Sequence, residues 1–172
     1  MSPFPLLSNG PHEDLSPADR LFEPFIGSWD LDITWYDHGA VTRRAKGEWH
    51  FAWVLEGRAV QDVWVVPPRE QRHGTDELYE YGTSIRFPDP SCGGWRSTWL
   101  GPMQRVVRVF VARPADGDVV LETRLEDGRP MQWRFSGIRP TSFSWSNATE
   151  QDGEWIVTQR FTARRVPDTS LA

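Results

Sequence analysis

The sequence has few of the residue types on which several common protein classes depend. Cys92 is the single cysteine among 172 residues, which excludes an internal disulfide framework and a multi-cysteine metal site. No apolar run approaches the roughly 20 residues that a membrane-spanning helix requires. The N-terminus lacks the basic start and long apolar stretch of a secretory signal. We therefore expect a cytoplasmic protein that does not insert into membranes.

Charge and motif content exclude further classes. The formal net charge is −5, and Lys46 is the only lysine. This balance disfavours a broad nucleic-acid-binding surface, which needs clustered positive charge. The sequence contains no glycine-rich phosphate loop, no Gly-x-Ser-x-Gly nucleophile motif and no metal-binding histidine spacing. We expect no nucleic-acid partner, no metal and no cofactor.

Tryptophan, in contrast, is abundant, with ten copies in the chain. Rings of this size fill wide protein interiors or line pockets. The length fits one domain that can bury its own hydrophobic core. We divide the chain into a flexible N-terminal arm (residues 1–15), a single domain (residues 16–166) and a C-terminal tail (residues 167–172).

The domain begins with a short helical segment. Ser16 followed by Pro17 favours a helix start, and Pro24 and Gly27 end the helix early. The apolar residues of this segment form a small plug: Leu21, Phe22, Phe25 and Ile26. After Gly27 the apolar residues recur at every second position, which is the pattern of a half-buried strand.

Nine further stretches with strand character follow, separated by turn-forming pairs such as Glu56-Gly57. The expected strands cover residues 29–35, about 45–55, 58–66, 78–87, 95–100, 105–112, 118–124, 130–136, 142–149 and 154–164. Short connections indicate an antiparallel meander, and closure into a barrel removes its unpaired edges. The charged loop at residues 67–77 is a lid or a solvated surface loop, of which we favour the second.

The opening of the first strand resembles that of the calycins, the lipocalin-like barrels. Phe25-Ile26-Gly27-Ser28-Trp29 matches their Gly-x-Trp opening after a helical plug. The stretches GEWHFAWVLEGRAVQDVW, YGTSIRFPDP and WRSTWLGP resemble a largely uncharacterised bacterial family of calycin-like proteins, and the likeness spans residues 21–165. The resemblance implies a cup for a small, mostly apolar molecule. It also implies an arginine of the closing strand against Trp29, for which the candidates are Arg160, Arg164 and Arg165.

Haem is disfavoured within this comparison. Nitrobindin-like haem barrels use a histidine late in the chain, whereas the last histidine here is His73.

The turn at Glu56-Gly57 allows two strands to be paired. A two-residue hairpin places Leu55 opposite Arg58, and it gives the further pairs Trp53–Val60, Phe51–Asp62 and Trp49–Trp64. We expect this bulky face inside the barrel, although a slip of one residue would reverse the assignment. The same parity predicts four further inward sets: Tyr79, Tyr81, Thr83, Ile85 and Phe87; Trp95, Ser97 and Trp99; Met131, Trp133 and Phe135; Phe143, Trp145, Asn147 and Thr149. On the last strand it predicts that Val157, Gln159 and Phe161 point inward.

These assignments give the candidate site residues. The expected ligand-binding residues are Trp53, Arg58, Trp64, Tyr79, Trp99, Trp133 and Trp145. For Arg58 and Asp62, one possibility is that either anchors a polar end of the ligand. The other, which we favour, puts Arg58 in water at the rim and bonds Asp62 to backbone or to an arginine.

Three functions fit the sequence. The first is binding of an aromatic, isoprenoid or acyl-type molecule in an aromatic-lined cavity. The second is a cofactor-free cyclase, isomerase or hydratase in which His50, Asp62 or Tyr81 moves a proton. The third is an interaction protein that forms a homodimer through an exposed apolar face. We rank them in this order.

Overall fold

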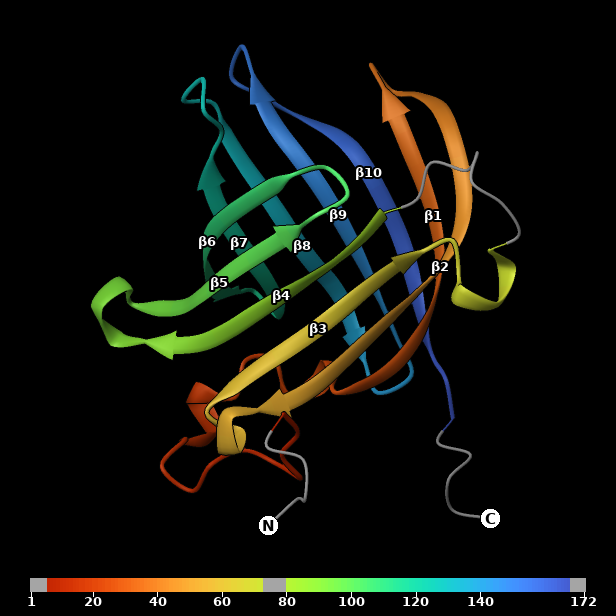
Figure 1. Cartoon of the computed structure of the whole chain (residues 1–172). Coiled ribbons are helices and arrows are strands. Elements are labelled where there is room, and N and C mark those ends of the chain that lie inside the picture. Colours follow the sequence, from red (N-terminus) through yellow and green to blue (C-terminus); the bar gives the residue numbers. More distant parts are fainter. Residues whose placement is uncertain (1–5, 73–79, 168–172) are drawn as a thin grey trace.

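A computed structural model describes residues 6–72 and 80–167 of the chain. Within these ranges, ten antiparallel strands form one closed barrel, in which each strand pairs with the next and β1 pairs with β10 (Figure 1). The predicted all-β meander, closed into a lipocalin-like barrel, is therefore confirmed. The strands are β1 (Gly27–Asp37), β2 (Ala40–Val54), β3 (Ala59–Val66), β4 (Glu80–Asp89), β5 (Gly94–Gly101), β6 (Val106–Ala115), β7 (Asp118–Arg124), β8 (Pro130–Arg139), β9 (Ser142–Gln151) and β10 (Glu154–Arg165).

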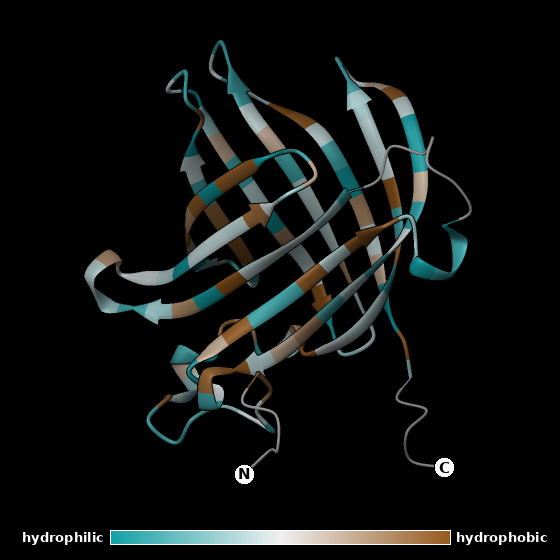
Figure 2. Ribbon diagram, in the orientation of Figure 1, coloured by the Kyte–Doolittle hydropathy of each residue, from teal (hydrophilic) through white to brown (hydrophobic). Residues whose placement is uncertain are grey.

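The helical segments in the described residues are single 3-10 turns. They are η1 (Pro17–Asp19), η2 (Glu23–Phe25), η3 (Leu55–Gly57), η4 (Arg69–Gln71) and η5 (Pro90–Cys92). Colouring by hydropathy shows apolar and polar residues in turn along many of the strands (Figure 2). In β1, for example, Trp29, Leu31 and Ile33 are buried between more exposed neighbours. This alternation directs one face of each strand into the barrel.

The plug closes one end of the barrel. Phe22 and Phe25, from the η1–η2 segment at the lower end of Figure 1, are fully buried. The ring centroid of Phe22 lies 5.2 Å from that of Trp95, and the ring centroid of Phe25 lies 4.7 Å from that of Phe135. Burying a phenylalanine side chain contributes roughly 1.5–3 kcal/mol, so the plug is part of the core. The predicted helical plug is present, as short 3-10 turns.

Arg165 is the arginine that packs against Trp29. Its guanidinium carbon lies 4.1 Å from the centroid of the Trp29 ring. The same group donates hydrogen bonds to the backbone carbonyls of Ile26 at 2.6 Å and Pro24 at 2.8 Å. Arg165 therefore joins the last strand to the plug and to the first strand.

The predicted register of the β2–β3 hairpin is confirmed for three pairs: Trp49–Trp64, Phe51–Asp62 and Trp53–Val60. The turn between the strands is a 3-10 turn rather than a two-residue hairpin. Residues near the N-terminus lie against this turn, because the Ser8 amide donates to the Trp53 carbonyl at 2.8 Å and the His12 amide to the Gly57 carbonyl at 3.0 Å. Backbone contacts thus hold part of the segment that we expected to be a flexible arm.

Candidate functional site

A cavity of about 210 Å³ lies inside the barrel, at the end away from the plug. Five of the ten tryptophans line it. They come from β2, β3, β5, β8 and β9, and their inward orientation follows from the alternation of each strand: Trp49, Trp64, Trp99, Trp133 and Trp145. The interior is therefore filled with side chains around the plug and hollow beyond it.

Polar side chains lie among these rings. The cavity lining includes Glu80, Gln104, Arg108, Asn147 and Gln159. Gln104 is exposed and Arg108 half-buried, so the mouth of the cavity lies at the β5–β6 turn. In the described part of the chain, one carboxylate and one guanidinium thus line a largely aromatic cavity.

The carboxylate is tied to two neighbours. The indole N–H of Trp64 donates to Glu80 Oε2 at 3.0 Å, and the amide of Gln159 donates to the same oxygen at 3.5 Å. Glu80 lies opposite Val66 in the β3–β4 register, which places it inward with Trp64. These contacts fix one polar corner of the cavity, formed by β3, β4 and β10.

The structure brings together four of the seven predicted ligand-binding residues, Trp64, Trp99, Trp133 and Trp145. Trp53 is buried but does not line the cavity. On β2 it lies beyond Phe51, whose ring packs against Phe25 of the plug, and so farther along the strand from the cavity-lining Trp49. Tyr79 lies outside the described residues.

Arg58 is not inside the barrel, and its side chain is 53% exposed. It donates to Asp14 at 3.2 Å and lies 2.8 Å from the ring nitrogen Nε2 of His12. The prediction that Arg58 lines the cavity is wrong, because the chain leaves the strand geometry in the η3 turn before it reaches this residue. The arrangement that we favoured, with Arg58 at the rim, agrees with the structure.

The inward orientation that we expected for Tyr81 is also wrong. Its side chain points outward, with the residue 39% exposed, and lines a groove on the outer face of β3–β6. The inward face of β4 instead carries Gly82, Ser84 and Arg86. The reason is steric, because a Cβ on Gly82 would lie 2.5 Å from the ring of Trp99. Large neighbouring rings require small residues at this point of β4.

Asp62 points inward but is buried beneath the cavity rather than exposed to it. It forms an ion pair with Arg86, and both side chains are 0% exposed. The Ser84 amide also donates to Asp62 Oδ1 at 3.1 Å. The guanidinium of Arg86 lies 4.7 Å from the ring centroid of Phe22, over the plug. This agrees with the arrangement that pairs Asp62 with an arginine.

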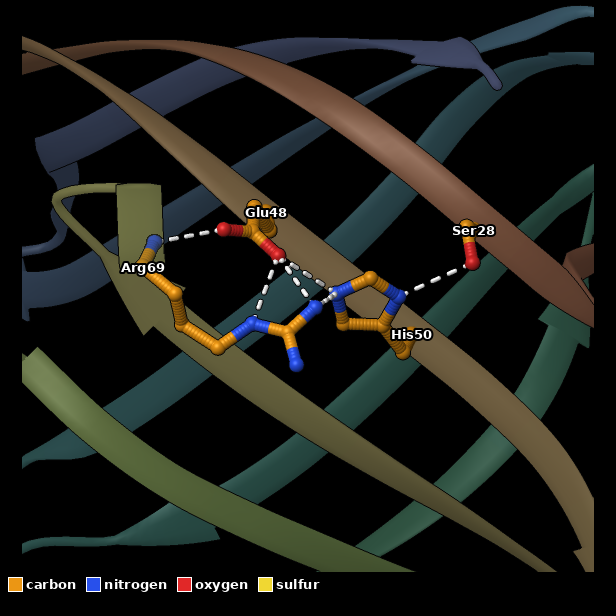
Figure 3. Close-up of polar contacts among 4 residues, drawn as sticks. All are labelled: Ser28, Glu48, His50 and Arg69. Atoms are coloured by element: carbon orange, nitrogen blue, oxygen red, sulfur yellow. Dashed lines mark hydrogen bonds and ion pairs between the residues drawn. The ribbon is translucent and has the colours of Figure 1, made fainter. Parts of the chain in front are cut away.

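His50 lies on the outer face of β2, in a polar network with Ser28, Glu48 and Arg69 (Figure 3). His50 Nε2 lies 2.8 Å from Glu48 Oε2 and Nδ1 lies 2.9 Å from Ser28 Oγ. An ionised carboxylate only accepts, so Nε2 is the donor in the contact with Glu48. The network links η4 to β2. The backbone N–H of Arg69 donates to Glu48 at 2.6 Å, and the guanidinium of Arg69 donates to the same carboxylate at 2.9 Å.

These contacts change the acidity of Glu48. Burial raises its pKa, but hydrogen bonds from His50 and Arg69 outweigh burial, and the pKa lies below the ordinary value of 4.5. Glu48 therefore stays ionised under mildly acidic conditions.

The sequence alone did not identify Glu80, Gln104 and Arg108 as lining residues. Arg108 could have been found, because it has the same parity as the buried residues Phe110 and Ala112 of β6. Gln104 lies in a turn, where no alternation indicates direction. In the described part of the chain, no group of three or more His, Cys, Asp or Glu residues could hold a metal ion. No helix in that part is long and apolar enough to cross a membrane.

No protein-family model matches the sequence, and neither does any curated protein. Among solved structures, the barrel is similar to the S-type phycobiliprotein lyase CPES from Guillardia theta, with a TM-score of 0.56 and 14% sequence identity over 86% of this chain and 91% of that chain. A redesigned beta barrel, b11L5F_LGL, matches at a TM-score of 0.47 and 14% identity over 88% of this chain and 100% of that chain. At such identity the likeness to the lyase concerns the fold. The chain thus forms a closed ten-stranded antiparallel barrel with an aromatic cavity at one end.

Proposed function

We propose that this protein binds a small, mostly apolar molecule in the cavity lined by Trp49, Trp64, Trp99, Trp133 and Trp145. The observation that carries the proposal is the hollow of about 210 Å³ among five indole rings. Aromatic side chains offer a large apolar surface, and ligand sites combine such walls with a few polar groups. An apolar cavity of about 150 Å³ accommodates benzene, so a ligand of one or two rings fits here.

The alternative of a cofactor-free enzyme is not favoured by this geometry. Of the three expected acid–base residues, His50 and Tyr81 lie on the outside of the barrel, and Asp62 is paired with Arg86 below the cavity. A general base must come within hydrogen-bonding reach of its substrate. Among the residues that the structure describes, Glu80 is the one carboxylate in the cavity lining, and its oxygen already accepts two hydrogen bonds. We therefore retain binding as the function.

A pair of adjacent valines provides the test. Val106 lines the cavity at its mouth, whereas Val107 points outward and is 68% exposed. We expect Val106→Trp to weaken binding of 2-methylnaphthalene at least tenfold, measured by calorimetric titration, and Val107→Trp to leave it unchanged. Equal affinities in the wild type and Val106→Trp would refute binding in the cavity. Val106 also lines the outer groove together with Val107, so weakening by Val107→Trp, with or without weakening by Val106→Trp, would place the ligand in that groove.

Native mass spectrometry of the protein purified gently from its host is the complementary measurement. An added mass that is lost on denaturation would identify the class of ligand. The homodimer and the cytoplasmic location stay predictions from the sequence, and sedimentation of dilute protein tests the first of them.

A further inference from the structure

The tryptophans around the cavity differ in whether their indole N–H groups are used. Trp64 donates its N–H to Glu80 at 3.0 Å. The indole nitrogens of Trp49, Trp133 and Trp145 are buried and have no hydrogen-bond partner among the described residues. Three residues that line the cavity thus carry indole donors that the described residues leave unused.

These three indoles are neighbours. The ring centroids of Trp133 and Trp145 lie 5.4 Å apart, and those of Trp49 and Trp145 lie 6.4 Å apart. The residues are 8%, 6% and 3% exposed for Trp133, Trp145 and Trp49 respectively. Leaving a buried donor unpaired destabilises a protein, so such groups call for a partner. The cavity is where that partner can enter.

The donors define the chemistry of the partner. An indole N–H donates and never accepts, so its complement is a hydrogen-bond acceptor. A carboxylate supplies two oxygens with about four acceptor positions, which suits several donors on one wall. A neutral carbonyl supplies a single oxygen.

Arg108 adds positive charge to the same cavity. Within the described part of the chain it forms no ion pair or hydrogen bond, and it lines the cavity opposite Trp99 in the β5–β6 register. The ring of Trp99 lies 5.9 Å from that of Trp133. Charged hydrogen bonds between arginine and carboxylate are among the strongest in proteins. Arg108 therefore favours an anion on the Trp133 side.

The negative charge of Glu80 opposes an anion, and its position decides where the anion can lie. Glu80 is held at the corner with Trp64 and Gln159, on β3, β4 and β10. The unused donors Trp133 and Trp145 and the charge of Arg108 come from β8, β9 and β6. The carboxylate of Glu80 and the guanidinium of Arg108 thus come from different strands of the cavity wall, β4 and β6.

We propose that the ligand is a small ring-bearing carboxylate whose ring packs among the tryptophans and whose carboxylate binds to the unused indole N–H groups and to Arg108. This inference rests on the binding function proposed above and specifies its ligand class.

The experiment compares carboxylates with hydrocarbons of the same shape. Benzoate and 2-naphthoate are titrated against toluene and 2-methylnaphthalene by calorimetry, and the indole N–H signals are followed by NMR of protein labelled with [¹⁵N]tryptophan. Each signal is assigned by a Trp→Phe substitution. We expect at least one carboxylate to bind tenfold or more tightly than its hydrocarbon, and to shift the signals of Trp49, Trp133 or Trp145 downfield.

Two arginine variants test whether the preference for carboxylates depends on the charge of Arg108 itself or on the net charge of the protein. Arg108→Gln is expected to remove the preference for the carboxylate and to leave hydrocarbon affinity within about twofold. Arg139→Gln makes the same change at an exposed position that does not line the cavity, and it should keep the preference.

Three outcomes would contradict these proposals in distinguishable ways. If the hydrocarbons bind as tightly as the carboxylates, the inference is wrong and the proposed binding function stands. If the carboxylates are preferred but Arg139→Gln removes the preference as fully as Arg108→Gln, the assignment to Arg108 and its indole neighbours is wrong. If neither class of compound binds, both the inference and the proposed function fail.

Discussion

Replacing Asp62 by alanine removes one partner of the ion pair buried beneath the cavity. Asp62 and Arg86 are both 0% exposed at the side chain, so the guanidinium that is left behind has no access to water. Removing one member of such a pair costs about 3–5 kcal/mol. Proteins of this kind unfold with about 5–15 kcal/mol, so this loss is a large share of the total. We expect Asp62→Ala to be among the most destabilising single changes in the barrel.

Urea unfolding followed by tryptophan fluorescence measures the effect. With an m value of about 2 kcal/mol/M, the expected loss lowers the urea midpoint by roughly 1.5–2.5 M. The control is Asp127→Ala, which breaks an ion pair with Arg129 whose side chains are 52% and 46% exposed. Water and salt screen an exposed pair and leave it little net effect on stability, so the control midpoint should hardly move.

The double variant Asp62→Leu/Arg86→Met distinguishes loss of the pair from loss of packing. Methionine can fill the space beside Phe22 without a buried charge, and apolar replacement of both partners is often neutral or stabilising. We expect the double variant to be more stable than Asp62→Ala, and it carries the test if the single variant does not fold. An Asp62→Ala protein as stable as Asp127→Ala would refute the reasoning.

Three further changes test other parts of the structure. Glu48→Gln should flatten the dependence of stability on pH, because the pKa of Glu48 is lowered in the folded state. In the wild type the ionised Glu48 side chain stabilises the fold by about 1 kcal/mol. This contribution is complete above the ordinary pKa of 4.5 and is lost as the pH falls through the folded-state pKa. Arg165→Met should lower the free energy of unfolding by about 2–3 kcal/mol in a denaturant titration, because it removes the contact with Trp29 and the hydrogen bonds to backbone carbonyls. Gly82→Ala should cost about 1–3 kcal/mol and weaken binding of 2-methylnaphthalene, because the added Cβ would lie 2.5 Å from the Trp99 ring and 2.6 Å from the Leu100 carbonyl oxygen.

Two of these changes, Arg165→Met and Gly82→Ala, have a matched control. Arg164→Met alters an exposed neighbour of Arg165 and should change stability by less than about 0.5 kcal/mol. Gly10→Ala adds a Cβ that meets nothing within 4 Å, and it should leave binding intact. An unchanged pH profile in Glu48→Gln, or effects in the controls equal to those in the variants, would contradict the assignments.

Much of the fold could be predicted from the sequence, because strand alternation and turn residues are local features. The residues around Glu56-Gly57 illustrate this, since parity from the turn identified Trp49–Trp64 and Phe51–Asp62 as pairs. The excess of tryptophan also indicated an aromatic interior, and Trp64, Trp99, Trp133 and Trp145 do line the cavity.

The tertiary structure decided which face of β4 points inward. Parity says that Tyr81 and Thr83 share a face, but it does not say which face is inside. Hydrophobicity favoured the face with Tyr81, whereas the space left by Trp99 on β5 admits only the small residues of the other face, Gly82 and Ser84. This constraint comes from a neighbouring strand, so no pattern within β4 contains it.

The polar part of the site also depended on the closed barrel. The sequence by itself determined the strands, the hairpin register and the aromatic character of the interior, because each follows from residues close together in the chain. Only closure placed Glu80 beside Gln159, which is 79 residues away, and selected Arg165 as the arginine against Trp29. Side-chain partners across a barrel are set by how the strands close, and local alternation carries no information about that.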